Sequence, residues 1–172
     1  PESQDAYWTA SEYAGEAGRK VALTLSDLFC VERHHDDFLP LVRERIDILF
    51  ANEAEACALW GCDEVGAAVE RARAEVAVAC ITLSEKGSVV VSGAETHEIP
   101  AHPVDVVDTT GAGDLYAAGF LHGITHGRPL AECAALGSLA ASEVISHLGA
   151  RPQAVDGFRG QDDQPAVAQR LR

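Results

Sequence analysis

Positive charge is scarce in this sequence. Of its 172 residues, 13 are lysine or arginine and 27 are aspartate or glutamate, so the formal net charge is -14 at pH 7. A surplus of negative charge opposes long-range attraction to nucleic-acid phosphates or anionic lipid, and we expect no nucleic-acid or membrane partner. A phosphate ligand would have to be held by local contacts. A divalent cation would be a natural accessory, because it screens charge on both protein and ligand.

The sequence also lacks the pattern of a disulfide framework. It has five cysteines, at positions 30, 57, 62, 80 and 133, and no two of them form a Cys-x-x-Cys pair. Their odd number argues against a complete set of disulfides, and buried, reduced thiols are the better interpretation.

Long hydrophobic runs are absent too. The longest apolar run covers residues 76–83, far short of the roughly 20 residues that span a membrane. The opening residues do not show the basic and then apolar pattern of a secretory leader. We therefore expect a cytoplasmic protein.

The apolar residues that are present suffice for one folded domain. They make up 47% of the chain, which is enough for a core at this length. We assign residues 1–152 to that domain. Residues 153–172 are rich in Gln, Asp, Arg and Pro and are predicted to form a polar tail.

Hydrophobic periodicity predicts alternating helices and strands over the first half of the chain. The expected helices cover 3–17, 35–45, 52–61 and 64–74; the expected buried strands cover 20–26, 47–51 and 76–84, with 27–33 as a connector. Such crossovers favour a parallel sheet with helices on both faces. Two short strands joined around Gly93 follow, and then two helices, over about 112–126 and 129–148.

The segment "VVDTTGAGDLYAAGF", residues 106–120, has the residues of an anion site. Glycines at the start of a helix leave amide N–H groups unpaired, and the helix dipole adds positive charge there. A phosphoryl group in transfer would be stabilised at such a point, and Asp114 beside it could accept a proton from an attacking hydroxyl. The local alternative is a tight turn followed by a favourable acid in the first turn of a helix.

This segment resembles the C-terminal signature of the ribokinase-like, or PfkB, carbohydrate kinases. The resemblance rests on "DTTGAGD" at 108–114 with "AGF" at 118–120, on "NEAE" at 52–55, on "TLSEKG" at 82–87 and on "LGARP" at 148–152. It implies the C-terminal nucleotide-binding portion of a three-layer α/β/α, Rossmann-like sheet, without the family's N-terminal part and β lid. It also implies ATP-dependent phosphoryl transfer to a hydroxymethyl group of a small sugar or nucleoside. Within the family, "LTLSDLFCVERH" is similar to adenosine-kinase-like sugar kinases.

The resemblance also implies a role for individual residues. Asp114 would be the catalytic base, and three amides would form the anion hole: those of Gly111, Ala112 and Gly113. Asn52 and Glu55 would organise Mg²⁺ near the phosphates of ATP. Four residues would lie along the nucleotide: Thr82, Ser84, Gly87 and Ser138. Three positions match those that bind a monovalent cation in K⁺-activated members: Asp108, Thr110 and Gly149.

Several of these assignments have local alternatives. Asn52 followed by Glu55 is a good capping box, which does not exclude the magnesium role. "SEKG" fits a plain β-turn, and Ser84 stands where the family pattern has glycine. Tyr116 and Phe120 are interpreted as core residues. His122 with His126, and "HHDD" at 34–37, could bind a metal. The better interpretation is that these are solvent-exposed polar residues on helices.

Two other functional classes stay open. One is a non-catalytic nucleotide- or anion-binding module, because residues that contact the phosphoryl acceptor lie mostly in the family's N-terminal part. A dinucleotide-binding oxidoreductase is the poorer option, since the loop lacks the full G-x-G-x-x-G spacing. A family sheet without its first strands would expose an open edge and an apolar flank. We therefore predict self-association into a homo-oligomer.

Overall fold

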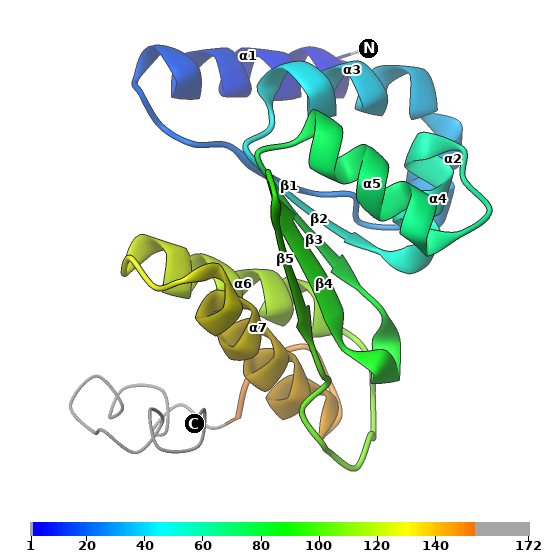
Figure 1. The fold of residues 1–172 in the computed structure, drawn as a ribbon, viewed down its shortest axis with the longest axis vertical. Coiled ribbons are helices and arrows are strands. Elements are labelled where there is room, and N and C mark those ends of the chain that lie inside the picture. The colour runs from blue at the N-terminus through cyan, green and yellow to red at the C-terminus, as the bar shows by residue number, and fades with distance from the viewer. Residues whose placement is uncertain (1, 154–172) are drawn as a thin grey trace.

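The computed structural model describes residues 2–153, so nearly all of the predicted polar tail lies outside the described residues. The elements follow in this order: α1 Glu2–Glu16, β1 Ala22–Thr24, α2 Leu28–Arg33, α3 His35–Arg45, β2 Ile48–Asn52, α4 Glu53–Trp60, α5 Val65–Glu75, β3 Val78–Thr82, a 3-10 turn Ser84–Lys86, β4 Ser88–Ser92, β5 Glu95–Ile99, α6 Ala112–Thr125 and α7 Leu130–Ile145 (Figure 1).

The five strands form one sheet in the order of the chain, β1-β2-β3-β4-β5. β1, β2 and β3 are parallel, as the helical crossovers predict, whereas β4 pairs antiparallel with both β3 and β5. The two short strands around Gly93 are thereby confirmed as a hairpin. The register places Asn52 beside Thr82 and Thr82 beside Ser88. These three residues therefore lie side by side at the end of the sheet where β2 and β3 finish and β4 begins.

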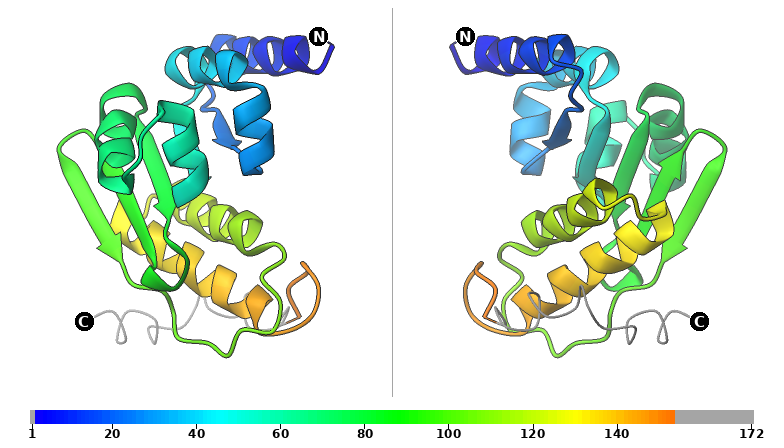
Figure 2. Two further views of the ribbon diagram at one scale, coloured as in Figure 1. Left: turned by 90° about the vertical axis from the view of Figure 1, so that its right-hand side faces the viewer. Right: turned by 90° about the vertical axis from the view of Figure 1, so that its left-hand side faces the viewer.

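Helices cover both faces of the sheet, which confirms the predicted three-layer α/β/α architecture. α6 and α7 lie on one face, and the earlier helices lie on the other (Figures 1 and 2). Side chains alternate along a strand, so Leu49 and Ala51 of β2 join the core under α2–α5. Ile48 and Phe50 join the core under α6 and α7, which includes Tyr116 and Phe120. The prediction that these two aromatics are core residues is therefore confirmed.

α6 and α7 pack closely because three glycines face the opposite helix. A Cβ atom at Gly119 would lie 2.6 Å from the carbonyl oxygen of Leu136, and one at Gly137 would lie 2.8 Å from that of Tyr116. At Gly123 it would lie 2.8 Å from the Cys133 Sγ. No side chain fits at these distances, so glycine sets the spacing of the helix pair that carries the predicted anion loop.

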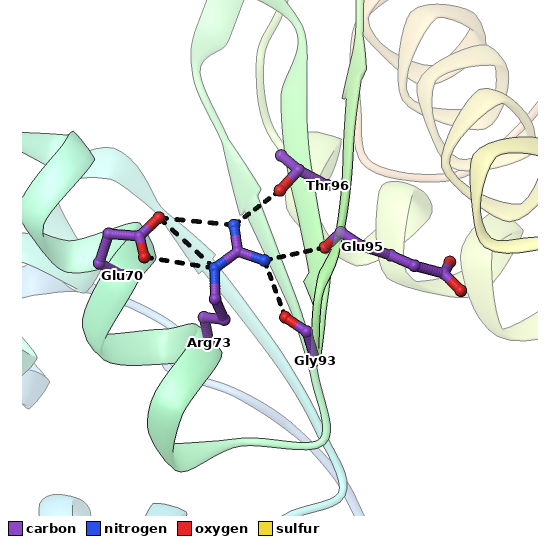
Figure 3. A network of polar contacts seen from close by, with 5 residues as sticks. All are labelled: Glu70, Arg73, Gly93, Glu95 and Thr96. Atoms are coloured by element: carbon purple, nitrogen blue, oxygen red, sulfur yellow. Dashed lines mark hydrogen bonds and ion pairs between the residues drawn. The ribbon is translucent and has the colours of Figure 1, made fainter.

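Arg73 of α5 links the helices on the α2–α5 face to the β4–β5 hairpin (Figure 3). Its guanidinium leaves α5 and donates to the carbonyl oxygens of Gly93 at 2.8 Å and Glu95 at 3.1 Å. It also donates to the Thr96 hydroxyl at 2.6 Å and to the Glu70 carboxylate at 3.3–3.4 Å. One side chain thus holds the β4–β5 turn against α5.

Two sequence predictions for the first third of the chain are wrong. Residues 20–26 were predicted to form a buried strand, but β1 is a three-residue edge strand in which Ala22 and Thr24 are exposed. Residues 27–33 were predicted as a connector, but they form α2. Asp27 caps this helix, because its carboxylate accepts a hydrogen bond from the Cys30 amide at 2.8 Å.

The prediction of buried thiols holds for two of the five cysteines. Cys80 and Cys133 are buried, whereas Cys30, Cys57 and Cys62 are half-buried, and all five are free thiols. Among the described residues, no helix is both long and apolar enough to cross a membrane. Residues 2–153 also hold no group of three or more His, Cys, Asp or Glu side chains placed to bind a metal.

Candidate functional site

The predicted anion loop ends at an open helix start. Gly111, the N-cap of α6, adopts the left-handed conformation with φ 83°, and Gly113 and Asp114 are exposed. The first amides of a helix point outward along its axis, and those of Gly113 and Asp114 have no acceptor among the described residues. The Ala112 amide differs, because it donates to the Thr109 carbonyl at 3.2 Å. The half-buried Gly111 also has an amide without an acceptor in that range. Three unpaired donors, those of Gly111, Gly113 and Asp114, therefore lie at the positive end of α6.

The Asp114 carboxylate lies in the first turn of the same helix. It is exposed and makes no hydrogen bond or ion pair with any residue in the described range. A carboxylate of this kind is free to accept a proton from a ligand hydroxyl, with the unpaired amides next to it in the chain.

Asp108 ties the anion loop to the segment that follows α7. One carboxylate oxygen accepts from the Thr110 amide at 3.0 Å and from the Thr110 hydroxyl at 2.7 Å; the other accepts from the Gly149 amide at 2.9 Å. These bonds, first of all that from Gly149, lower the pKa of Asp108 to about 2. The three residues predicted to share a monovalent cation thus lie together, around a carboxylate that stays ionised at neutral pH.

The same two segments touch at Gly111. A Cβ atom there would lie 2.8 Å from the Cβ of Ala150 and 3.1 Å from its Cα. Glycine at position 111 is therefore required twice, by its positive φ and by this close approach.

Asn52 and Glu55 form the predicted capping box at the carboxyl end of β2 and the start of α4. The Asn52 amide and side chain each donate to one Glu55 oxygen, at 2.9 and 2.7 Å, and the Glu55 amide donates back to Asn52 at 2.9 Å. Glu55 is only 5% exposed. Burial raises its pKa, the bond from Asn52 lowers it, and the negative charge of Asp27 raises it further. Asp27 is thus a neighbour of this site that sequence reasoning misses, because the sequence pattern predicts only a connector over residues 27–33.

The predicted nucleotide residues are linked through the chain after β5. Gly87 has φ 101°, and a Cβ atom there would lie 2.7 Å from the Ala101 amide nitrogen. Ser138 of α7 accepts a hydrogen bond from the His102 amide at 3.0 Å and donates to the Pro100 carbonyl at 3.4 Å. Residues 99–102 therefore contact Gly87 on one side and Ser138 on the other.

Thr82 and Ser84 lie just before Gly87, where β3 ends and the 3-10 turn begins. The Thr82 hydroxyl donates a long hydrogen bond, 3.5 Å, to the Ala51 carbonyl. Ser84 adopts φ 54°, a left-handed conformation that is costly for a residue with a side chain. Glycine, which the resemblance leads us to expect at this position, would adopt this conformation without that cost.

α6 is anchored so that its start lies at the carboxyl ends of β2 and β3. The Tyr116 hydroxyl, buried in the first turns of α6, donates to the Ser88 hydroxyl at 2.8 Å, and Ser88 pairs with Thr82. Tyr116 also packs against Phe50 of β2, with ring centroids 6.5 Å apart. Open α/β sheets bind their ligands at the carboxyl ends of their strands.

Two hollows lie elsewhere, at the β1 edge. An apolar one of about 210 Å³ is formed by α1, β1 and α3, and a more polar one of about 280 Å³ lies at the ends of α1 and α3. Neither includes a predicted site residue. The start of α6 is an exposed surface of donors, and burial of this loop, which would contradict an anion site, is not observed.

Known proteins share both the sequence and the fold. Residues 1–156 match the pfkB family of carbohydrate kinases. A cytidine kinase from Thermococcus kodakarensis is 40% identical over 116 residues, which are 66% of this chain and 42% of the relative. The crystal structure of adenosine kinase from Sinorhizobium meliloti has a TM-score of 0.89 and 47% identity over 95% of this chain and 51% of its own.

A further crystal structure supports the same grouping. The probable sugar kinase from Rhizobium etli CFN 42 has a TM-score of 0.89 and 41% identity, with 94% of this chain and 50% of the other covered. The chain thus spans about half the length of these relatives. The family match, together with the loop, capping box and sheet described above, shows that this chain belongs to the pfkB family of carbohydrate kinases.

Proposed function

We propose that this chain is the ATP-binding and phosphoryl-transfer half of a sugar or nucleoside kinase. The observation that carries the proposal is the open start of α6, where the unpaired amides of Gly113 and Asp114 adjoin the exposed Asp114 carboxylate. The cytidine kinase and the adenosine kinase among its relatives favour a nucleoside hydroxymethyl group as the acceptor.

In the proposed reaction, Asp114 accepts the proton of the acceptor hydroxyl as its oxygen attacks the γ-phosphorus of ATP. The bond from that phosphorus to the β–γ bridging oxygen breaks, and ADP leaves with the electron pair. Amides at the start of α6 stabilise the negative charge of the migrating group, and the helix dipole adds to their effect. The Gly111 amide has no partner to give up, and the Ala112 amide takes part once its bond to Thr109 opens. Gly111 also supplies the turn that exposes its neighbours.

The nucleotide would extend from this point along Thr82, Ser84, Gly87 and Ser138. Segment 99–102 holds Gly87 and Ser138 in place, as described above. A side chain at Ser84, in place of the family's glycine, would face this nucleotide.

Asn52 and Glu55 fit a magnesium site. Both side chains offer an oxygen, which is the ligand atom that magnesium prefers. Burial is the main cause of the raised pKa of Glu55, and the negative charge of nearby Asp27 adds to it. Magnesium, when bound, would offset phosphate charge. Asp108, Thr110 and Gly149 fit a monovalent cation, because an ionised carboxylate lies at their centre.

One observation favours a second function. The chain spans about half the length of its kinase relatives, so on its own it would act as a nucleotide-binding module without turnover. Binding and catalysis must therefore be measured separately.

Calorimetry with MgATP tests nucleotide binding by the chain, and ADP release with a panel of sugars and nucleosides tests turnover. Turnover is measured on the chain and on a chimera that places the amino-terminal half of the S. meliloti adenosine kinase before Pro1. Asp114→Asn in the chimera should lower kcat by roughly 10²–10⁴-fold, because a general base contributes that much, with MgATP binding little changed.

Asp105→Asn is the matched control, since Asp105 is an exposed acid outside the helix start. It should leave kcat unchanged. If Asp114→Asn retained the turnover of the parent chimera, Asp114 would not be the base. If MgATP did not bind to the chain, the nucleotide site itself would be excluded.

A further inference from the structure

We propose that Cys57 and Cys62 form a redox pair, which a small disulfide compound oxidises reversibly to an intramolecular disulfide. Cys57 lies in the last turns of α4, and Cys62 lies just beyond its end. All five cysteines of the chain lie among the described residues, and all five are free thiols. The structure thus holds the pair in its reduced form.

A Schellman motif ends α4 and brings the two cysteines together. Gly61 has φ 60°, and its amide donates to the Ala58 carbonyl at 3.4 Å. The Cys62 amide donates to the Cys57 carbonyl at 2.9 Å. These two bonds define the motif, in which the side chains at the two outer positions commonly contact each other. Cys57 and Cys62 occupy those outer positions.

The backbone bond between the two cysteines limits how far apart they can lie. The carbonyl oxygen of Cys57 is two covalent bonds from its Cα atom, and the amide nitrogen of Cys62 is one bond from its own. With a hydrogen bond of 2.9 Å between them, the two Cα atoms are at most about 6.8 Å apart. Disulfides span Cα–Cα distances of about 4.4–6.8 Å, so the existing backbone can accommodate one.

The two thiols also share their surroundings. Both side chains are half-buried and pack against the core under α2–α5. Burial is the main cause that raises the pKa of the Cys57 thiol, and the charge of Cys62 is the next, as expected of near neighbours. The Cys62 thiol donates to the Trp60 carbonyl at 3.5 Å, which keeps it at the end of the helix.

A second pair of neighbouring thiols lies in the core. The charge of Cys133 adds to burial in raising the pKa of Cys80, so these two residues are also close. Both are buried, and a reagent cannot reach them while the chain is folded. Intramolecular oxidation of the folded chain should therefore be confined to the end of α4.

The reaction is a thiol–disulfide exchange. One protein thiolate attacks a sulfur of the reagent, forms a mixed disulfide and releases one reagent thiolate. The other protein thiolate then attacks the protein sulfur of the mixed disulfide, so that the Cys57–Cys62 bond forms and the second reagent thiolate leaves. The two protein thiols lose two protons and two electrons; the reagent disulfide takes the electrons, and the released thiolates take the protons.

Charge decides which reagent is the better probe. Three carboxylates, those of Glu53, Asp63 and Glu64, add to the raised pKa of Cys57. A cationic disulfide should therefore approach this end of α4 more readily than an anionic one. Cystamine is such a compound, and its reduced form, cysteamine, reverses the reaction.

The test incubates the folded chain with cystamine and cysteamine at about pH 8, where part of the thiols ionises. The chain is then alkylated and digested with trypsin. One tryptic peptide, residues 46–71, contains both cysteines. We expect its mass to fall by two hydrogen atoms, with no alkyl group added, and excess cysteamine should restore two alkylatable thiols.

Two variants identify the pair. In Cys62→Ser, oxidation of Cys57 should stop at the mixed disulfide with cysteamine. Cys30→Ser is the matched control, because Cys30 is half-buried like the pair but lies on α2. It should leave the oxidation of peptide 46–71 unchanged. Circular dichroism establishes that each variant folds.

A further measurement separates the fold from proximity in the sequence. The equilibrium constant for forming the disulfide is determined for the folded chain and for the chain unfolded in urea. It should be about tenfold or more larger in the folded chain, because the unfolded chain must close the loop at a cost in entropy.

Each outcome decides the proposal, which does not depend on the kinase function. The loss of two hydrogen atoms in the folded chain, with a larger constant than in urea, supports it. A chain that stops at mixed disulfides, or that links to a second chain through these cysteines, would overturn the intramolecular pair. A constant no larger than in urea would show that the end of α4 does not favour the disulfide, and would also overturn the proposal.

Discussion

Among single residues, Ser84 holds a backbone conformation that its side chain disfavours. Its φ of 54° lies in the left-handed region, where a residue with a Cβ atom loses about 1–2 kcal/mol relative to glycine. Its carbonyl accepts the Gly87 amide at 3.1 Å, which keeps the turn in place.

Ser84→Gly should therefore raise the free energy of unfolding by about 1 kcal/mol, as measured by urea denaturation. Ser92→Gly is the control. Ser92 ends β4 without a positive φ, and glycine there should lower the free energy of unfolding by about 0.5–1 kcal/mol. If both variants destabilised the chain equally, Ser84 would not be strained.

Asp108 makes stability depend on pH in a defined direction. Its pKa in the folded chain is about 2, below the ordinary value of about 3.9 that it regains on unfolding. A depressed carboxyl pKa contributes stability above the unfolded value, and that contribution is lost as pH falls through the folded value. The relevant window therefore runs from about pH 4 down to about pH 2.

Asp108→Asn should destabilise the chain near neutral pH, because the amide group cannot accept all three hydrogen bonds. The difference in unfolding free energy between the two proteins should shrink across that window, as the parent carboxyl becomes protonated. Urea titrations in a potassium-free buffer measure it. A difference that stayed constant with pH would show that the charge of Asp108 does not matter.

At the level of secondary-structure elements, Arg73 holds the β4–β5 hairpin against α5 (Figure 3). Arg73→Met removes its bonds to Gly93, Glu95 and Thr96 and should cost about 1–2 kcal/mol of stability. Hydrogen exchange of amides 92–96 should accelerate, because the turn loses its contact with the helix.

Arg71→Met on the exposed side of the same helix is the control, and should leave exchange in the hairpin unchanged. Equal acceleration in both variants would mean that the hairpin depends on α5 as a whole and not on the Arg73 guanidinium.

Hydrophobic periodicity predicts the helices and strands whose pattern lies within their own residues. The helix over 35–45 was placed at the bounds of α3, and the hairpin around Gly93 was predicted correctly. β1 was misjudged because an apolar stretch does not reveal which segments cover it. α2 was missed because six residues are too few for periodicity, although Asp27 is a favourable N-cap.

For the whole molecule, the sequence resemblance predicted which residues share the candidate site, but not their bonds. Asp108, Thr110 and Gly149 lie together as expected, across 41 residues of chain. The bond from Ala112 to Thr109 was not foreseeable, because turn geometry depends on the φ of Gly111. The roles of these residues in binding and catalysis stay predictions until the variants are measured.

The hydrogen bond between Asp108 and Gly149 links the segment before α6 to the segment after α7. It therefore joins the two ends of the helix pair that the short α6–α7 connection does not join. This bond couples the two segments, so a ligand that shifts the start of α6 should also displace residues 149–150. A fluorescent probe attached through Ala150→Cys, next to Gly111, would therefore report on events at the start of α6 once the five native cysteines have been replaced.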